Sequence, residues 1–294
     1  MNAIHQSVMP DEVVALLDPQ PGQVVVDCTT GVGGHAELLA RRVAPGGQVI
    51  ALDQDPAMVE HSRTRLAGLP VRLVHANFED IPDVLQKLQI ERVDAVLADL
   101  GFCSDQLANP ERGLSFQHDG PLDMRLDPTR GEPASALVRR LQERELADIF
   151  WRFGEERHSR RIAKKIVETR TNAQILTTGQ FADLVRSCVP RSKGASIDPA
   201  TRSFQGLRIA VNDELGALER FLSCVPGCLK PGGRIAVISF HSLEDRLVKR
   251  AFKQADVFKE LTRKPMTPSE EEVARNSRSR SAKLRGASRV GDVV

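Results

Sequence analysis

The sequence has no tyrosine and only one tryptophan, and aromatic residues make up 4% of its 294 positions. It also lacks long hydrophobic runs, because the longest apolar stretches, such as Val24–Val26 and Ile235–Ile238, are far too short to cross a bilayer. The opening MNAIHQSVMPDEVV has no basic start followed by an apolar core, so no secretion signal is expected. These absences favour a cytoplasmic protein.

Cysteine is scarce as well. Five cysteines in a chain of this size do not form a disulfide framework, and they fit a reducing compartment. Cys224 and Cys228 are the only close pair, and no further thiol or imidazole at matching spacing completes a metal site. We therefore expect no bound metal and interpret this pair as buried apolar filler.

An excess of charge of one sign is also missing. The chain has 41 Lys and Arg residues against 39 Asp and Glu residues, which gives a formal net charge of +2. Any nucleic-acid binding must then come from local basic patches and not from a global field. The length exceeds what one core usually supports, so one large domain with an insertion, or two domains, is expected.

The first hundred residues alternate between strand-like and helix-like patterns. Apolar strands are predicted at Gln23–Cys28, Gln48–Asp53, Val71–Phe78 and Val93–Leu100, and helices between them at Gly34–Val43, Pro56–Ala67 and Ile81–Leu88. Strands that alternate with helices of this length indicate βαβ units and a parallel sheet.

The alternation stops after Gly101. A segment dense in Gly, Pro, Asp and Asn predicts turns, and the pattern from Ala134 to Val189 is entirely helical. We therefore predict a doubly wound α/β domain formed by residues 1–114 and 202–294, interrupted by an all-helical insertion at residues 115–201.

The C-terminal part returns to the sheet. One long helix is expected over Phe204–Leu229, then a fifth strand over Arg234–Phe240, and then a helix opened by a capping-type Ser. Closing strands are expected around Val257–Thr262 and Ala282–Val290.

A glycine-rich loop carries the first chemical signal. Asp27 closes the first strand, Gly31, Gly33 and Gly34 follow, and a helix begins directly behind them. Glycines there let the backbone approach a ligand that faces the helix N-terminus. Asp53 ends the second strand, where a carboxylate can accept hydrogen bonds from both hydroxyls of a ribose. Together they predict a nucleoside-containing ligand; the alternative is a tight turn beside an exposed acid.

Two cofactors share this geometry, NAD and S-adenosylmethionine. An acid just ahead of the glycines is unfavourable for a pyrophosphate, but Asp27 suits an ammonium group and a cationic sulfur. The later segment LKPGGRIAVISF has the helix, Pro-Gly-Gly turn and strand that methyltransferases commonly show. We therefore favour S-adenosylmethionine, and an NAD-dependent dehydrogenase is the alternative enzyme.

Eight segments, spread over nearly the whole chain, resemble in order those of one family, the bacterial 16S ribosomal RNA cytosine-N4 methyltransferases, known as MraW or RsmH. The segments are HQSVMPDEVV (5–14), DCTTGVGGH, ALDQDP, ADLGFCSDQL, NPERGLSFQHDGPLDMRLDPTRG (109–131), GEERHSRRIAKKIVETR (154–170), TRSFQGLRIAVNDEL (201–215) and ISFHSLEDRLVKR (238–250). The blocks GPLDMR, FQGLRIAVN and FHSLEDR are not general methyltransferase features, so the resemblance is specific.

The resemblance implies a Rossmann-like class I methyltransferase domain with an inserted helical domain that recognises RNA. It also implies methylation of a cytidine in the decoding region of the small ribosomal subunit, with S-adenosylmethionine as cofactor. The family's cofactor contacts fall on seven positions of this sequence: Gly33, Gly34, His35, Asp53, Phe78, Asp99 and Gln106. Whether the protein is a monomer or a homodimer stays open.

The chemistry of the exocyclic amine singles out a few residues. A cytosine N4 is a poor nucleophile, and a site can help by accepting hydrogen bonds from its N–H groups. Asp99, at the end of the fourth strand, is placed for this as the catalytic residue. His241 and Ser242, after the fifth strand, are secondary catalytic candidates; the alternative is that they cap the next helix.

Cys103 raises a chemical rival, a cytosine-C5 methyltransferase. Such enzymes add a cysteine covalently to the ring, and Cys103 follows a strand-ending acid. The family normally has Ser at this position, however, and Ser cannot replace a thiol nucleophile. A further alternative is a non-catalytic RNA-binding assembly factor that merely keeps the fold; retention of Asp53, Asp99 and the glycine loop argues against it.

Two basic clusters are candidates for RNA binding. They are Arg157, Arg160, Arg161, Lys164 and Lys165 in the insertion, and Arg278, Arg280 and Arg285 in a C-terminal stretch without acids from Arg275 to Gly291. Charge runs are more often solvated faces. With so few aromatic residues, binding led by phosphate and shape is expected, within the small ribosomal subunit.

Overall fold

The computed structural model describes residues 6–190 and 197–291. The chain forms two compact units: Met1–Cys103 with Leu215–Val294, here the sheet unit, and Ser104–Glu214, here the helical unit. The helical unit contains the whole of the expected insertion at residues 115–201, with further residues on both sides of it. The turn-rich segment after residue 103 and the helix that precedes residue 214 pack inside the helical unit. His5, which begins one of the resembling segments, lies outside the described residues.

The sheet unit is built on one seven-stranded sheet with the order β3-β2-β1-β4-β5-β7-β6. The strands are β1 (Val24–Asp27), β2 (Gln48–Asp53), β3 (Val71–His75), β4 (Val93–Asp99), β5 (Leu229–Ser239), β6 (Phe258–Glu260) and β7 (Lys283–Arg289). Pairing is parallel from β3 to β5, and β7 is antiparallel to both β5 and β6. Strand β1 lies inside the sheet, paired with β2 on one side and β4 on the other, so the order in which strands are added reverses between β1 and β4. Open α/β sheets bind ligands at such a topological switch point.

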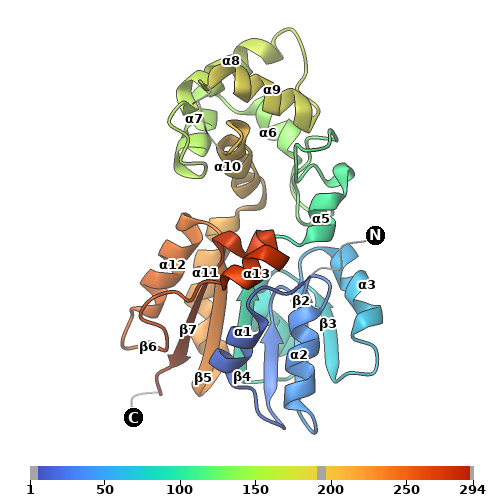
Figure 1. Ribbon diagram of the computed structural model, residues 1–294, viewed down its shortest axis with the longest axis vertical. Helices are drawn as coiled ribbons and strands as arrows, with labels where there is room; N and C mark the ends of the chain where they lie inside the picture. The colour runs from blue at the N-terminus through green and yellow to red at the C-terminus, as the bar shows by residue number, and fades with distance from the viewer. Residues whose placement is uncertain (1–5, 191–196, 292–294) are drawn as a thin grey trace. The chain divides into compact units, whose positions relative to one another are not determined.

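Helices cover both faces of this sheet (Figure 1). They are α1 (Pro10–Leu17), α2 (Gly34–Val43), α3 (Pro56–Arg65), α4 (Ile81–Lys87), α11 (Glu214–Cys228) and α12 (Ser242–Phe252). The short helix α13 (Glu270–Arg275) buries none of its residues and does not belong to these layers. Successive strand residues point to opposite faces: Val25 belongs to the core cluster that includes residues of α1 and α2, whereas Val26 belongs to the cluster that includes residues of α4, α11 and α12. The near-continuous apolar strands in the sequence reflect this burial on both sides.

The C-terminal expectations hold in part. The two closing strands appear as β6 and β7, and the fifth strand as β5. The single helix expected over Phe204–Leu229 is wrong, because the structure has two helices, with Asp213 between them in the left-handed region at φ 48°. Amphipathic periodicity continues across that one residue, so the break leaves almost no trace in the pattern.

The helical unit contains α5 (Ser104–Ala108), α6 (Ala134–Arg140), α7 (Glu143–Arg152), α8 (Ser159–Arg170), α9 (Thr178–Cys188) and α10 (Ala200–Asn212). Helix α10 packs against α6, α7 and α9, and α8 packs against α7 and α9. One close approach depends on two glycines. A Cβ added to Gly206 would lie 2.9 Å from the backbone nitrogen of Gly154, so α10 and the end of α7 can meet only without side chains there.

Among the helices that the structure describes, none is long and apolar enough to cross a membrane.

Candidate active site

The glycine loop between β1 and α2 is shaped by backbone conformations that favour glycine. Gly31 has φ 53° and Gly33 has φ 88°, and Gly33 directly precedes the first residue of α2. A Cβ on Gly33 would lie 3.1 Å from the side chain of Leu66, and one on Gly34 would lie 2.1 Å from Oγ of Ser7. The loop thus presents bare backbone at the N-terminus of a helix, as the sequence predicts.

Asp53, at the end of β2, is tied to this loop. Its Oδ2 accepts a hydrogen bond from the backbone N–H of Gly31 at 2.7 Å, and its Oδ1 accepts one from Asp55 at 2.8 Å. Burial raises the pKa of Asp53 to about 7, and the nearby acids Asp55 and Asp27 add to this effect. Each oxygen keeps a lone pair that can accept a further hydrogen bond, so the acid is placed at the sheet edge where the ribose is expected.

Asp27 and Asp99 end the neighbouring strands β1 and β4, and His35 in the first turn of α2 faces them. The His35 Nε2 lies 3.5 Å from Asp99 Oδ2. The backbone N–H of Asp99 donates to Thr29 Oγ1 at 2.6 Å, which joins the ends of the two strands. Sequence reasoning proposed His35 and Asp99 as separate cofactor contacts; the structure brings them together as a pair.

The electrostatics of this cluster follow from its burial. Asp27 is fully buried, and desolvation raises its pKa to about 6 against the opposing effect of His35. Burial alone would lower the pKa of His35, but Asp99 and then Asp27 raise it above its usual value. The buried imidazole, which lies beside two acids, therefore binds a proton more readily than a free histidine does.

Three buried atoms of the cluster lack a hydrogen-bond partner within the described part of the chain: Asp27 Oδ2, His35 Nε2 and Asp99 Oδ1. Buried polar atoms are rarely left unpaired, because the unmade hydrogen bond costs about 1–3 kcal/mol. Two carboxylate oxygens beside bare loop backbone fit a ligand with cationic and N–H groups. S-adenosylmethionine, with an ammonium group and a sulfonium, has this chemistry.

Phe78 and Gln106 complete the predicted cofactor set. Phe78 follows β3, is half-buried, and makes an edge contact with Phe221 of α11 at a centroid distance of 5.4 Å. Gln106 is buried in α5, within the helical unit, and the other six residues belong to the sheet unit.

His241 caps helix α12. Its Nδ1 accepts a hydrogen bond from the backbone N–H of Glu244 at 3.4 Å, and its Nε2 lies 3.2 Å from Glu244 Oε1. Glu244 in turn accepts from the backbone N–H groups of Phe240 and His241. The expected capping Ser, Ser242, is instead the first residue of the helix. The capping interpretation of His241 is therefore realised in the structure.

Cys103 faces an apolar cluster. It is buried with Val32 and Met58, and its Sγ lies 3.2 Å from the sulfur of Met58. A thiol becomes a nucleophile as a thiolate, which needs a positive or polar environment that favours the charge. This surrounding argues for packing under the glycine loop, where a Cβ on Gly31 would lie 3.8 Å from Cys103.

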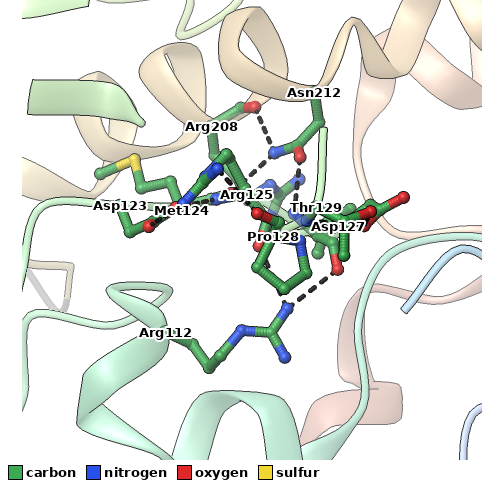
Figure 2. Close-up of polar contacts among 10 residues, drawn as sticks. Arg112, Asp123, Met124, Arg125, Asp127, Pro128, Thr129, Arg208 and Asn212 are labelled. Carbon is green, nitrogen blue, oxygen red and sulfur yellow. Dashed lines mark hydrogen bonds and ion pairs between the residues drawn. The ribbon is translucent and has the colours of Figure 1, made fainter. Parts of the chain in front are cut away.

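A hydrogen-bond network around Asn212 in the helical unit was not predicted (Figure 2). The side-chain amide of Asn212, the last residue of α10, donates to the carbonyl of Met124 at 2.8 Å and accepts from the N–H of Leu126 at 2.7 Å. Arg112 donates to the carbonyls of Arg125 and Leu126 at 3.1 and 2.9 Å. The blocks GPLDMR and FQGLRIAVN thus contact each other. Their common place among the family-specific segments was the only signal of this contact in the sequence.

The basic candidates differ in exposure. Arg157, Arg160, Arg161, Lys164 and Lys165 are all exposed, on α8 and the turn before it, and Arg278 and Arg280 are exposed too. Arg285 contradicts the prediction: it is 5% exposed and its Nε donates to Asp245 Oδ1 at 2.7 Å. It lies on β7, where strand alternation turns it toward α12, so it is unavailable to phosphates.

The parallel sheet with its reversal at β1, the bare glycine loop and the strand-end acids define a Rossmann-like methyltransferase that uses S-adenosylmethionine. A family model described as "MraW methylase family" matches residues 2–290. The chain belongs to this family.

Two sequence relatives agree with this assignment. The "Ribosomal RNA small subunit methyltransferase H" of Sorangium cellulosum is 47% identical, over 98% of this chain and 91% of the relative. The protein of the same name from Desulfosudis oleivorans is 45% identical, over 99% of this chain and all of the relative. A methyltransferase structure from Streptococcus mutans, in complex with SAH, has a TM-score of 0.46 and 12% identity, over 97% of this chain and 100% of that one.

Proposed function

We propose that this protein methylates N4 of a cytidine in the decoding region of 16S ribosomal RNA, at position 1402 by resemblance, within the small ribosomal subunit of the cytoplasm. The observation that carries the proposal is the half-buried Asp99 carboxylate at the end of β4, which is paired with His35 and whose buried Oδ1 has no hydrogen-bond partner among the described residues. An acceptor at that place is what an exocyclic amine needs.

The cofactor-binding residues are proposed from the resemblance and from their places in the fold. Gly33, Gly34 and His35 would hold the cofactor at the N-terminus of α2, and Asp53 would accept from its ribose. Phe78 would line the adenine, and Asp99 and Gln106 would complete the set. Asp27, with an unpartnered buried oxygen, suits the ammonium end. When bound, S-adenosylmethionine supplies an electrophilic methyl group on a cationic sulfur.

The residues of the chain contribute mainly position and charge. In-line displacement depends on alignment, so the rigid strand ends that carry Asp27, Asp53 and Asp99 supply much of the rate. Asp99 Oδ1 accepts a hydrogen bond from the amine N–H, which leaves the nitrogen lone pair free to react. The pair with His35 holds the carboxylate in that orientation, and the same oxygen can take the proton that the amine loses.

The RNA partner is proposed to contact the exposed cations of α8 and its preceding turn, with Arg278 and Arg280 as further contacts. Arg285, which is buried and bonded to Asp245, is not among these contacts. His241 and Ser242 remain second candidates near the base, although the contacts of His241 are those of a helix cap.

One experiment tests the proposal. Small subunits that lack the mark are incubated with the protein and a labelled methyl donor, and the RNA is digested to nucleosides. Labelled N4-methylcytidine is expected. Labelled 5-methylcytidine would instead require a covalent role for Cys103, and the absence of label would leave an RNA-binding protein without catalytic activity.

A further inference from the structure

The only tryptophan of the chain, Trp151, is exposed. It lies in the last turn of α7, and 59% of its surface is accessible, the second-highest value among the large hydrophobic residues that the structure shows as exposed. Tryptophan is on average a well-buried residue, because its large apolar surface is costly to leave in water. Its flat ring suits an unpaired nucleic-acid base, which has an apolar face of similar size.

The backbone around Trp151 is held firmly. The N–H of Glu156 donates to the carbonyl of Phe150 at 3.0 Å and closes the turn after α7. A Cβ added to Gly154 in this turn would lie 2.4 Å from the carbonyl oxygen of Arg202 in α10. The turn is therefore clamped between its own ends and α10, so the tryptophan is presented on a rigid support, which lowers the entropic cost of binding.

Cations surround this turn. The hydrogen bond between Glu156 and Phe150 places the Cα atoms of Trp151 and Arg157 at most about 11 Å apart. Arg160 follows in the first turn of α8, and both arginines are exposed. Within the described residues, no carboxylate lies within ion-pair distance of either guanidinium. Arg202, whose backbone touches Gly154, is exposed as well.

Two acids also lie near Trp151, and they limit the kind of binding partner that suits this surface. Asp148, one turn before Trp151, and Glu155 in the turn are both exposed. The surface is thus not a uniformly positive patch that would attract any polyanion equally. An aromatic ring with several arginines beside it suits a partner that offers both a base and a phosphate, and that partner is an unpaired nucleotide.

We propose that the α7–α8 corner, formed by Trp151, Arg157, Arg160 and Arg202, binds one unpaired nucleotide of RNA. The Trp151 ring stacks on the base, and the arginines contact the flanking phosphates. This inference rests on the proposed function for its RNA substrate, and it adds a base-stacking contact that the residue composition argued against.

The chain provides its own probe. Because Trp151 is the only tryptophan, the emission of the full-length protein reports on this corner alone. The emission is measured with an unstructured 12-nucleotide RNA and with a duplex RNA of 12 base pairs, and binding of each is followed separately by filter retention. The single strand is expected to quench Trp151 and to protect it from acrylamide. The duplex is expected to bind without either effect.

Variants test the same point by affinity. Trp151→Ala is expected to weaken single-strand binding about 5- to 150-fold, the range for one stacked base. Trp151→Phe keeps a flat ring and should stay within a few-fold of the unaltered protein. Leu176→Ala, another exposed apolar residue of the helical unit at 53% exposure, is the matched control and should change nothing. Circular dichroism confirms that each variant is folded.

Several outcomes would overturn the inference. They are unchanged emission with RNA bound, an equal response to the duplex, an unchanged affinity of Trp151→Ala, or a response only to whole subunits, which would indicate a protein contact. Methyl transfer is assayed on the same preparations. If Trp151 stacks on a base but no cytidine is methylated, the stacking contact is supported and the proposed methyltransferase function is contradicted.

Discussion

At Asp99, the arrangement of single atoms decides what the residue can do. Its backbone N–H is fixed to Thr29 Oγ1 at 2.6 Å, one carboxylate oxygen faces His35 at 3.5 Å, and the other has no partner in the described chain. Asp99 is thus positioned by Thr29, in the loop after β1, and by His35 of α2, and one carboxylate oxygen stays available to a substrate. A residue held in this way can act on a substrate without first rearranging.

We expect Asp99→Asn to lower kcat for methyl transfer by at least about 100-fold, the size seen when one preorganised group is lost. The amide keeps the shape of the carboxylate and the backbone bond to Thr29, so the fold should survive. Labelled methyl incorporation measures the loss, and thermal unfolding checks the fold. Glu60→Gln, a matched change at a side chain that is 72% exposed, should be neutral. Near-normal turnover of a folded Asp99→Asn protein would remove Asp99 from the mechanism.

Asp27 predicts a pH dependence of stability. Its pKa is raised from 3.8 to about 6 by burial, so the folded protein binds a proton there that the unfolded chain has already lost. Stability from this group is complete below about pH 4 and is lost as the pH rises through 6. Replacing the acid by the neutral Asp27→Asn removes this source of the decline.

The measurement is the melting temperature of the ligand-free protein between pH 4.5 and 7.5. The unaltered protein should lose stability over this range, and Asp27→Asn should show a flatter profile that differs most near pH 6 to 7. His35, whose pKa is also raised, contributes a decline of the same sign and remains in the variant. Parallel profiles for the two proteins would show that Asp27 does not titrate in this way.

At the scale of elements, the sequence predicted β2 and α2 to the residue and placed Asp27, Asp53 and Asp99 at strand ends. These succeed because apolar runs and glycine turns are local signals. Two other features were not predicted. The break at Asp213 leaves the amphipathic periodicity unchanged, and the burial of Arg285 depends on Asp245, a neighbour that is distant in the chain. Arg285 reads as one more basic residue of the tail until β7 turns it toward Asp245.

The hydrogen-bond network around Asn212 acts between elements, because one side chain joins the end of α10 to the loop at residues 122–127 (Figure 2). Asn212→Ala would leave the carbonyl of Met124 and the N–H of Leu126 without this partner. We expect the free energy of unfolding of the helical unit to fall by about 1–3 kcal/mol. Trp151 lies in this unit, so its emission during urea unfolding follows the loss directly.

Asn172→Ala, at an exposed position just after α8, is the control for removing an asparagine side chain. Asn212→Asp keeps an acceptor for Leu126 but loses the donor to Met124, so it should recover at most part of the stability. An Asn212→Ala protein that unfolds at the same urea concentration as the unaltered one would mean that water replaces the amide without cost.

For the whole molecule, the distribution of charge matters more than its sum. With 41 basic and 39 acidic residues, the protein has no strong overall field to attract RNA. The exposed side of α8 is an exception, because Arg160, Arg161, Lys164 and Lys165 follow one another there. Among the residues that the structure describes, only Lys164 of these four has an acid within ion-pair distance, Glu168 at 3.9 Å. If α8 meets the RNA, affinity should depend on these positions and not on net charge.

This dependence can be measured as a salt slope. Replacing Arg160, Arg161, Lys164 and Lys165 together by Gln should weaken RNA binding and reduce the slope of log K against log salt by up to about 3, since each lost phosphate contact to a single strand removes about 0.7. The control removes the same four charges from exposed positions of the sheet unit, namely Arg42, Arg63, Lys87 and Lys253. This control has the same net charge as the α8 variant. Equal salt slopes for the two variants would mean that RNA binding depends on overall charge. A reduced slope in the α8 variant alone would place the phosphate contacts on α8.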